Sequence, residues 1–209
     1  TSGLGVEKSA AAHSTYELVI DGFPAADAVI HTPYCDVLAS NVALSGAGVE
    51  LVGMDAREYA LKHALEPLRA VYDYIFIDCS PSLESLFNIN VLVAVQYILI
   101  PIKVDKNSIE GYNVMLETVQ NVRELVNPDI RVLGIFMTAV ETGASLDREM
   151  IANFPQMLPE LAFHSYIRKN IDVKKAPLAL KPLCFYSPRC TATEDYAALC
   201  GEMLERMEG

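Results

Sequence analysis

Tyr74-Ile75-Phe76-Ile77-Asp78 is the stretch of sequence that decides the fold class. Its first four residues are apolar without alternation, which is typical of a strand that is buried on both faces of a parallel sheet. Its last residue is a carboxylate, which such a strand presents at the ligand-binding edge of the sheet. The stretch therefore predicts an α/β protein in which helices cover both faces of a mostly parallel sheet.

The neighbouring segments alternate between helix and strand patterns. We expect helices over residues 15–22, 55–72, 84–93, 108–126, 146–158 and 193–207, and strands over 35–39, 74–78, 97–102, 131–138 and 162–166. This order predicts a doubly wound α/β fold, which binds ligands beyond the carboxyl ends of its strands. No repeat or linker interrupts the pattern, so we expect a single domain over residues 1–209.

The composition fits an acidic globular protein. Its 209 residues are 52% hydrophobic, and 16 Lys+Arg against 27 Asp+Glu give a formal net charge of −11. This bulk charge disfavours binding to nucleic acid. The five cysteines form no C-x-x-C pair, which favours a reducing, cytoplasmic location over a disulfide framework. The longest apolar run, residues 91–104, is too short and too interrupted to span a membrane.

Asp78 is the first candidate for chemistry. A carboxylate at the tip of a buried strand is the group with which a nucleotide hydrolase holds Mg²⁺ through a water molecule. The alternative is an aspartate that only caps the helix expected after it. The pattern G-x-x-x-x-G-K-S/T does not occur, so the sequence contains no phosphate-binding loop of that kind.

The end of the strand at Thr138 and the loop over residues 167–177 are the other candidate places. The loop gathers Arg168, Lys169, Lys174 and Lys175 in an otherwise acidic chain. These cations face either phosphate groups or only solvent, and the charge pattern leaves both interpretations open.

Six short segments match, in order and spacing, the motifs of one protein family. Residues 1–6 (TSGLGV) are similar to its ATSGLG segment, and residues 72–83 (YDYIFIDCSPSL) to YDYIiIDcPPSL, with Ser80 in place of the first proline. Residues 127–138 are similar to NP-x-L-x-iLGvl-x-T, and residues 167–182 to IPRNVRLsEAPSxGKP. The remaining matches are residues 45–51 and 100–111. The chain thus resembles the ParA/Soj partitioning ATPases, relatives of MinD, over essentially its full length.

The resemblance implies a deviant Walker ATPase of chromosome or plasmid partitioning. Such an enzyme forms a homodimer with ATP between its subunits, hydrolyses ATP with Mg²⁺, binds DNA and is stimulated by a ParB-like partner. By position, Asp78 matches the Walker B aspartate, which holds Mg²⁺ and serves catalysis. The residues that match the adenine side are Thr138, Arg168, Lys169 and Asn170, with Pro177 in the loop that closes over the base.

The sequence also departs from the family pattern. The family's P-loop strand aligns upstream of Thr1, so we expect a preceding segment of the intact protein to supply the phosphate cradle and a central strand beside residues 74–78. Arg168 replaces a proline on the adenine side. Gly143 and Asp172 stand where the family carries DNA-contacting arginines, which predicts weak DNA binding. The C-terminal helix is acidic, which argues against a basic membrane anchor.

Two other functions stay open at this point. One is a non-enzymatic truncated or pseudo-ATPase module that acts by binding a partner protein, because the chain lacks the phosphate-binding loop. The other is a cluster-carrying relative of the nitrogenase iron protein, which needs paired cysteines at a subunit interface. Cys79 has no partner at a suitable spacing, so this function is the least favoured.

Overall fold

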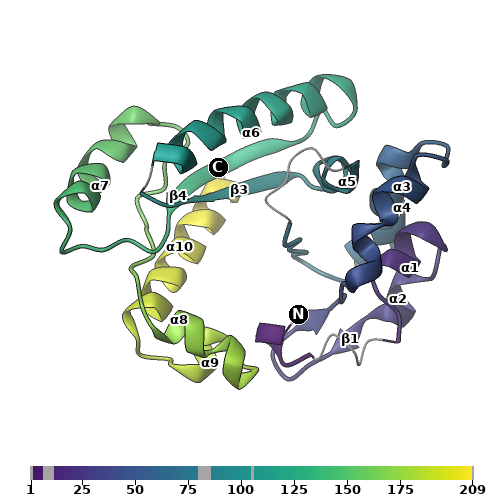
Figure 1. Ribbon diagram of the computed structural model, residues 1–209, viewed down its shortest axis with the longest axis horizontal. Helices are drawn as coiled ribbons and strands as arrows, with labels where there is room; N and C mark the ends of the chain where they lie inside the picture. The colour runs from purple at the N-terminus through teal and green to yellow at the C-terminus, as the bar shows by residue number, and fades with distance from the viewer. Residues whose placement is uncertain (1, 7–11, 80–85, 105, 209) are drawn as a thin grey trace.

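The computed structural model describes residues 2–6, 12–79, 86–104 and 106–208 (Figure 1). The N-terminal half contains η1 (Ser2–Leu4), α1 (Thr15–Ile20), α2 (Ala25–Ala28), β1 (Ile30–His31), β2 (Asp36–Val37), η3 (Val42–Ser45), α3 (Ala47–Leu51), η4 (Arg57–Tyr59), α4 (Ala60–Leu65), η5 (Glu66–Ala70) and α5 (Leu86–Ala94), where η denotes a 3₁₀ helix. The C-terminal half contains β3 (Tyr97–Ile102), α6 (Lys106–Leu125), β4 (Arg131–Met137), α7 (Ser145–Met157), α8 (Asp172–Lys175), η6 (Pro177–Ala179), α9 (Leu183–Tyr186) and α10 (Thr191–Glu208).

A parallel pair of strands, β3 and β4, organises the C-terminal half. The register shifts after Ile98, because β4 holds one extra residue at this point and Leu99 pairs with Gly134. Parallel bridges from Ile135 to Ala162 and from Val140 to Arg168 continue the pairing beyond β4. The strands predicted over 97–102 and 131–138 are confirmed, whereas of the one predicted over 162–166 the described structure shows only the bridge at Ala162.

Helices cover both faces of this sheet, as the sequence predicts. On one face, Ile100, Ile102 and Ile135 pack in a buried cluster with side chains of α6 and α7. On the other face, Leu133 packs with Leu199 and other α10 side chains. Figure 1 shows α6 and α10 on opposite sides of β3 and β4. The α/β class is therefore confirmed, and the pattern of alternating strands and helices accounts for it.

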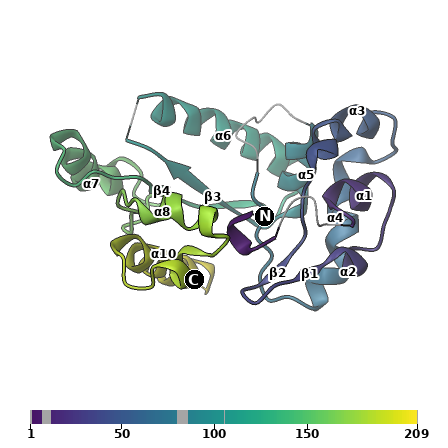
Figure 2. The same ribbon diagram turned by 60° about the horizontal axis from the view of Figure 1, so that its bottom comes forward.

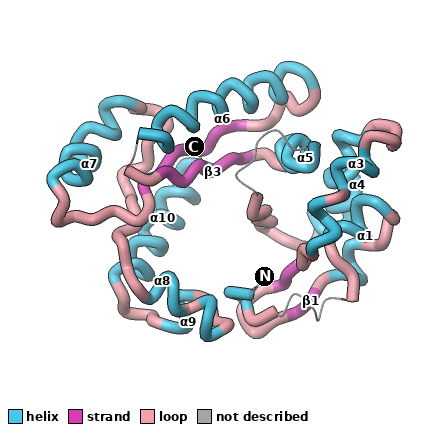
Figure 3. The backbone as a smooth tube through the Cα atoms, viewed as in Figure 1, coloured by secondary structure: helices cyan, strands magenta, loops and turns pink. Residues whose placement is uncertain are grey.

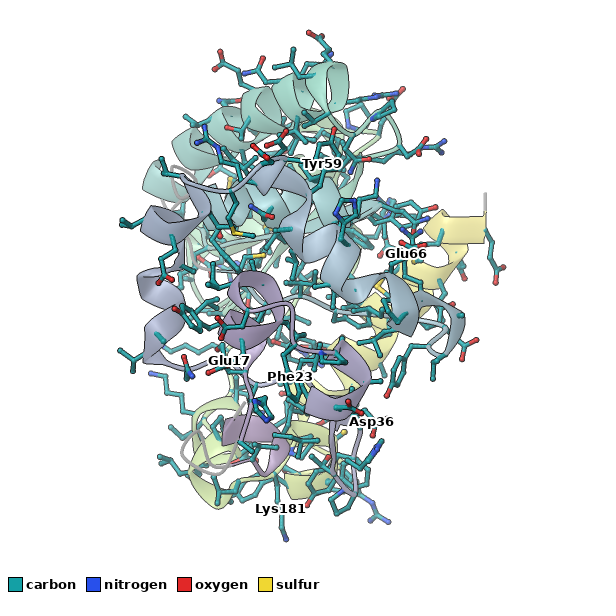
Figure 4. The ribbon with its side chains drawn as sticks, turned by 90° about the vertical axis from the view of Figure 1, so that its right-hand side faces the viewer. Glu17, Phe23, Asp36, Tyr59, Glu66 and Lys181 are labelled. Carbon is teal, nitrogen blue, oxygen red and sulfur yellow. The ribbon has the colours of Figure 1, made fainter. Side chains whose placement is uncertain are left out.

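The N-terminal half is a group of short helices around a separate apolar cluster. Leu18, Leu51 and Leu61 are buried together, and Val91 of α5 completes the cluster. Ser14 is the N-cap of α1: its hydroxyl accepts a hydrogen bond from the Tyr16 N–H, and the Glu17 carboxylate accepts one from the Ser14 N–H (Figure 4). This capping box satisfies main-chain donors that the first helical turn leaves unpaired.

Two contacts join the described parts of the two halves. Leu92 and Val93 of α5 pack against α6, and the Tyr59 hydroxyl donates to the Val126 carbonyl at 3.3 Å (Figure 4). At the second place η1 lies against η6, and the Tyr34 and Phe185 ring centroids are 4.8 Å apart (Figure 2). Within the described ranges, no helix combines the length and the hydropathy needed to cross a bilayer.

The prediction of a strand over residues 74–78 is wrong, because the described structure has a loop there. Residues 71–79 form a loop after η5, and Tyr74, Ile75 and Phe76 are 53%, 38% and 72% exposed (Figure 3). A strand needs a neighbour that exchanges main-chain hydrogen bonds with it, and no described residue pairs with this segment. The apolar sequence therefore has the composition of a buried strand without the pairing that would make it one.

Candidate functional site

A groove of about 620 Å³ lies beyond the carboxyl end of β4. Its walls come from the ends of β3 and β4, the start of α7 and the 167–174 segment. Thr138, Arg168, Lys169 and Asn170 all line it, so the structure brings together four of the residues selected from the sequence. This edge of the sheet is where α/β proteins bind their ligands.

Main-chain hydrogen bonds hold the groove in shape. The Val140 N–H donates to the Ile167 carbonyl at 3.0 Å, and the Lys169 N–H donates to the Val140 carbonyl at 2.9 Å. Between β4 and these bonds, Ala139 adopts a left-handed conformation with φ 57°. This conformation costs a non-glycine residue about 1 kcal/mol, so the surrounding bonds maintain a locally strained turn in the groove wall.

Arg168 is bound to the protein rather than free in the groove. Its Nε donates to Asp195 Oδ1 and Oδ2 at 3.0 and 2.9 Å, and its Nη2 donates to Oδ1 at 2.6 Å. The hydrogen bonds and charge of Asp195 raise the pKa of Arg168. Arg168 therefore lines the groove as a fixed, neutralised cation.

Lys169 and Asn170 are also engaged. Lys169 Nζ donates to Glu141 Oε1 at 2.5 Å, and this carboxylate raises the pKa of the lysine. Asn170 donates from Nδ2 to Thr191 Oγ1 at 3.0 Å and accepts the Asp172 N–H at 2.8 Å. Their side chains reach a ligand only after exchanging these partners.

Two further lysines make the groove attractive to anions. Lys103 and Lys174 line it, and neither forms an ion pair with any residue in the described part of the chain. Asp147, another lining residue, accepts the Glu141 N–H at 2.6 Å and so helps to cap the turn before α7. The arrangement offers exposed positive charge beside a hydrogen-bonded main-chain frame.

Asp78 and Pro177 lie outside the groove lining. Asp78 is exposed near the end of the 71–79 loop, and residues 80–85, which include the end of the 72–83 motif match and the start of the helix predicted over 84–93, lie outside the described residues. Pro177 opens η6 and lies near Gly3, where an added Cβ would be 3.9 Å from its ring. The metal-binding role of Asp78 and the base-closing role of Pro177 stay predictions.

Gly143 and Asp172, the two positions where the family resemblance predicts DNA-contacting arginines, lie in different surroundings. Gly143 is exposed in the turn before α7. Asp172 opens α8, accepts a hydrogen bond from the Ser187 hydroxyl at 2.9 Å and lies 3.9 Å from Lys175 Nζ. An acid at this position offsets part of the positive charge of the 168–175 stretch.

α10 carries the residues that the sequence analysis missed. Besides Asp195, Glu202 accepts the main-chain N–H groups of His164 and Ser165 at 2.9 and 2.8 Å. Arg206 donates to the carbonyls of Leu133 and Leu161 at 3.2 and 3.3 Å. These residues lie on the polar side of an amphipathic helix, where charges usually face solvent, so nothing in the helix pattern distinguishes them.

Sequence comparison identifies the relatives of this chain. Residues 1–132 match the family described as an AAA domain. The chain is 33% identical over 205 residues to the sporulation initiation inhibitor protein Soj of Bacillus subtilis, across 97% of this chain and 81% of that protein. It is 32% identical over 207 residues to the chromosome partitioning protein ParA of Myxococcus xanthus, across 98% of this chain and 73% of that protein.

Solved structures agree with this relationship. Cobyrinic acid a,c-diamide synthase from Mycobacterium smegmatis, crystallised with ADP and magnesium, gives a TM-score of 0.73 at 26% identity, over 85% of this chain and 71% of that chain. The ATP complex of a Cyanothece McdA variant shares the fold, with a TM-score of 0.79 at 24% identity, over 99% of this chain and 78% of that chain. The chain therefore belongs to the ParA/MinD family of ATPases.

Proposed function

We propose that this chain acts as a ParA-like ATPase in chromosome or plasmid partitioning. It binds ATP with Mg²⁺, forms a homodimer when ATP is bound, hydrolyses the nucleotide and works with a ParB-like partner protein. The groove beyond β4, which gathers Thr138 and residues 168–170, is the observation that supports the proposal most directly. The five free cysteines support a cytoplasmic location.

The groove suits a nucleotide in size and charge. About 620 Å³ lies within the range of roughly 300–1,000 Å³ that small-molecule pockets occupy. Lys103 and Lys174 supply positive charge for anionic groups, and Thr138 supplies a hydroxyl at the end of β4. Lys169 would add to this charge only after leaving Glu141, to which its Nζ donates.

Asp78 would hold Mg²⁺. In phosphoryl-transfer enzymes this ion is bound by one or two carboxylates together with phosphate oxygens, rather than by a complete protein cage. An exposed carboxylate on a loop fits this role, and in the described ranges no group of three or more potential ligands forms a cage of its own. When bound, the metal and nucleotide would supply the electrophilic phosphoryl group, which Asp78 would help to position through the metal.

The decisive experiment measures nucleotide binding, dimerisation and hydrolysis together. We expect titration calorimetry to show ATP·Mg²⁺ binding, sedimentation velocity to show a dimer only with ATP, and phosphate release to stop in Asp78→Ala. Asp73→Ala is the matched control, because Asp73 is an exposed aspartate on the same loop. Hydrolysis that persists in Asp78→Ala would rule out Asp78 as the metal ligand, and failure of the chain to bind ATP would rule out the proposed function.

A non-enzymatic module is the second candidate. The exposed apolar residues Tyr74, Ile75 and Phe76, which pair with no strand in the described part of the chain, favour it, because a surface of this kind suits contact with another protein. This candidate predicts a stable homo- or heterodimer without nucleotide binding. A monomer that binds ATP with micromolar affinity would exclude it.

DNA binding, if it accompanies this activity, is expected to be weak. Gly143 supplies no charge, and Asp172 offsets Lys175, so Lys174 would carry most of the remaining contact with phosphate groups, because Lys169 is paired with Glu141. Fluorescence anisotropy with a short duplex at two salt concentrations tests this expectation. Lys174→Ala should reduce the slope of log Kd against log salt concentration by about 1, the value for one lost phosphate contact.

A further inference from the structure

Arg168 and Asp195 join the groove to the first turns of α10. Besides the three side-chain hydrogen bonds described above, Asp195 Oδ2 accepts the main-chain N–H of Arg168 at 2.9 Å. One carboxylate therefore holds both the side chain and the main chain of a residue that lines the groove. We call this arrangement the Arg168–Asp195 clamp.

The clamp is partly shielded from solvent. The Asp195 side chain is 12% exposed and that of Arg168 is 36% exposed. Burial alone would raise the pKa of Asp195, but the hydrogen bonds from Arg168 lower it overall. Both groups are therefore charged at neutral pH, and their forked geometry gives the pair direction as well as attraction.

The neighbours of Arg168 are attached to the same helix. Ile167 is buried in the cluster that contains Ala192 and Leu199 of α10, and Asn170 donates to Thr191 in the first turn of α10. Ile167, Arg168 and Asn170 thus contact α10, and among the described residues the clamp is the connection that holds the main chain of this segment through a charged side chain. If Asp195 is lost, the Arg168 N–H loses its acceptor and the guanidinium loses its anchor beside the groove.

We propose that Asp195 is a positioning residue for the groove: through Arg168 it fixes the main chain of residues 167–170 in the arrangement that accepts the base end of a nucleoside triphosphate. Asp195 does not line the groove, so it acts through Arg168 and the main chain. The identity of the ligand rests on the proposed function, whereas the clamp itself is a property of this structure.

The test combines nucleotide affinity with hydrogen exchange in the full chain. Asp195→Ala and Arg168→Ala should each raise the Kd for ATP·Mg²⁺ about tenfold, and the double variant should also lose about tenfold rather than a hundredfold, because the two residues act as one unit. Exchange at the main-chain N–H groups of Arg168 and Lys169 should become faster in Asp195→Ala. Asp195→Asn keeps an acceptor for the Arg168 N–H and should recover part of the protection.

Glu194→Ala is the matched control. Glu194 precedes Asp195, is 67% exposed and lies 3.9 Å from Arg168 Nη2, so this variant removes the same charge without removing the clamp. Far-UV circular dichroism at the assay temperature confirms that each variant is folded.

The inference is overturned if Asp195→Ala behaves like Glu194→Ala in both affinity and exchange, or if the two single effects multiply in the double variant. Failure of the wild-type chain to bind ATP would count against the proposed function alone, because the exchange data still decide whether the clamp orders residues 167–170.

Discussion

Replacing Gly134 by alanine tests how closely α10 and its neighbouring loop approach the sheet. Gly134 lies in β4 where the bulge ends. A Cβ added there would be 2.3 Å from Phe163 Cε2, 2.7 Å from Arg206 Nη1 and 2.7 Å from the Leu161 carbonyl oxygen. Carbon atoms in contact are normally separated by about 3.5–4.0 Å. The position therefore has no room for a side chain.

The free-energy cost of Gly134→Ala depends on how far the groups around the new Cβ can move. The Leu161 carbonyl accepts the Ile135 N–H at 2.7 Å, so it cannot retreat without breaking a sheet bond. Overpacking of a buried site costs about 1–3 kcal/mol. Displacing Arg206 Nη1 adds the loss of one of its hydrogen bonds to the Leu133 and Leu161 carbonyls, worth about 1.5–3 kcal/mol because the donor is charged. We expect Gly134→Ala to lower the free energy of unfolding by about 3 kcal/mol.

Thermal unfolding followed by far-UV circular dichroism measures the effect. A loss of 3 kcal/mol corresponds to a fall in Tm of about 6–12 °C for a chain of this size. Gly201→Ala is the control, because a Cβ at this exposed position in α10 meets no other atom within 4 Å. There the change removes a helix-weakening glycine and should raise stability by about 0.5–1 kcal/mol. A Tm for Gly134→Ala within about 2 °C of the wild type would refute the close-packing argument.

Three further substitutions test other parts of the structure. Burial alone would raise the pKa of Glu202, but the hydrogen bonds from the His164 and Ser165 N–H groups lower this pKa overall, so the stabilising effect of the carboxylate is complete above pH 4.5 and is lost as the pH falls below that value. Glu202→Gln should therefore flatten the pH dependence of the urea midpoint below pH 4.5, and equal slopes in variant and wild type would contradict this role. Asn127 donates to the Leu92 and Val95 carbonyls at the end of α5, so Asn127→Ala should cost about 2 kcal/mol in urea unfolding, and a neutral result would show that water replaces it. Leu180 has a left-handed φ of 53°, so Leu180→Gly should raise the Tm, corresponding to about 0.5 kcal/mol, and a lower Tm would mean that its side-chain contacts outweigh the strain.

The long periodic segments show how far sequence reasoning reaches. The predicted helices over 108–126 and 193–207 correspond to α6 and α10 within two residues at each end, and the predicted strand over 97–102 coincides with β3. In each of these segments the apolar spacing has a single period over several turns or residues, so local and tertiary preferences agree. The short elements β1, α8 and α9 carry too few residues to show any period, and the sequence did not predict them.

The sequence predicted part of the candidate site and missed the rest. The sequence alone placed Thr138 and residues 168–170 at the edge of the sheet, because carboxyl ends of parallel strands meet there. It also identified Asp78 and Pro177, which lie outside the groove lining, and it missed Asp195. Arg168 stands where a proline was expected, and its acid partner is 27 residues away on another element.

The sequence by itself determined the α/β class, the family and the segments that approach the groove, because these depend on local composition, periodicity and the order of motifs. Only the tertiary structure decided that Tyr74–Phe76 pairs with no other strand among the described residues, that Arg168 is held by Asp195, and that Gly134 permits contact between β4 and the Phe163–Arg206 pair. Strand pairing, ion pairing and close packing each require two distant segments to meet, and no local pattern records where they meet.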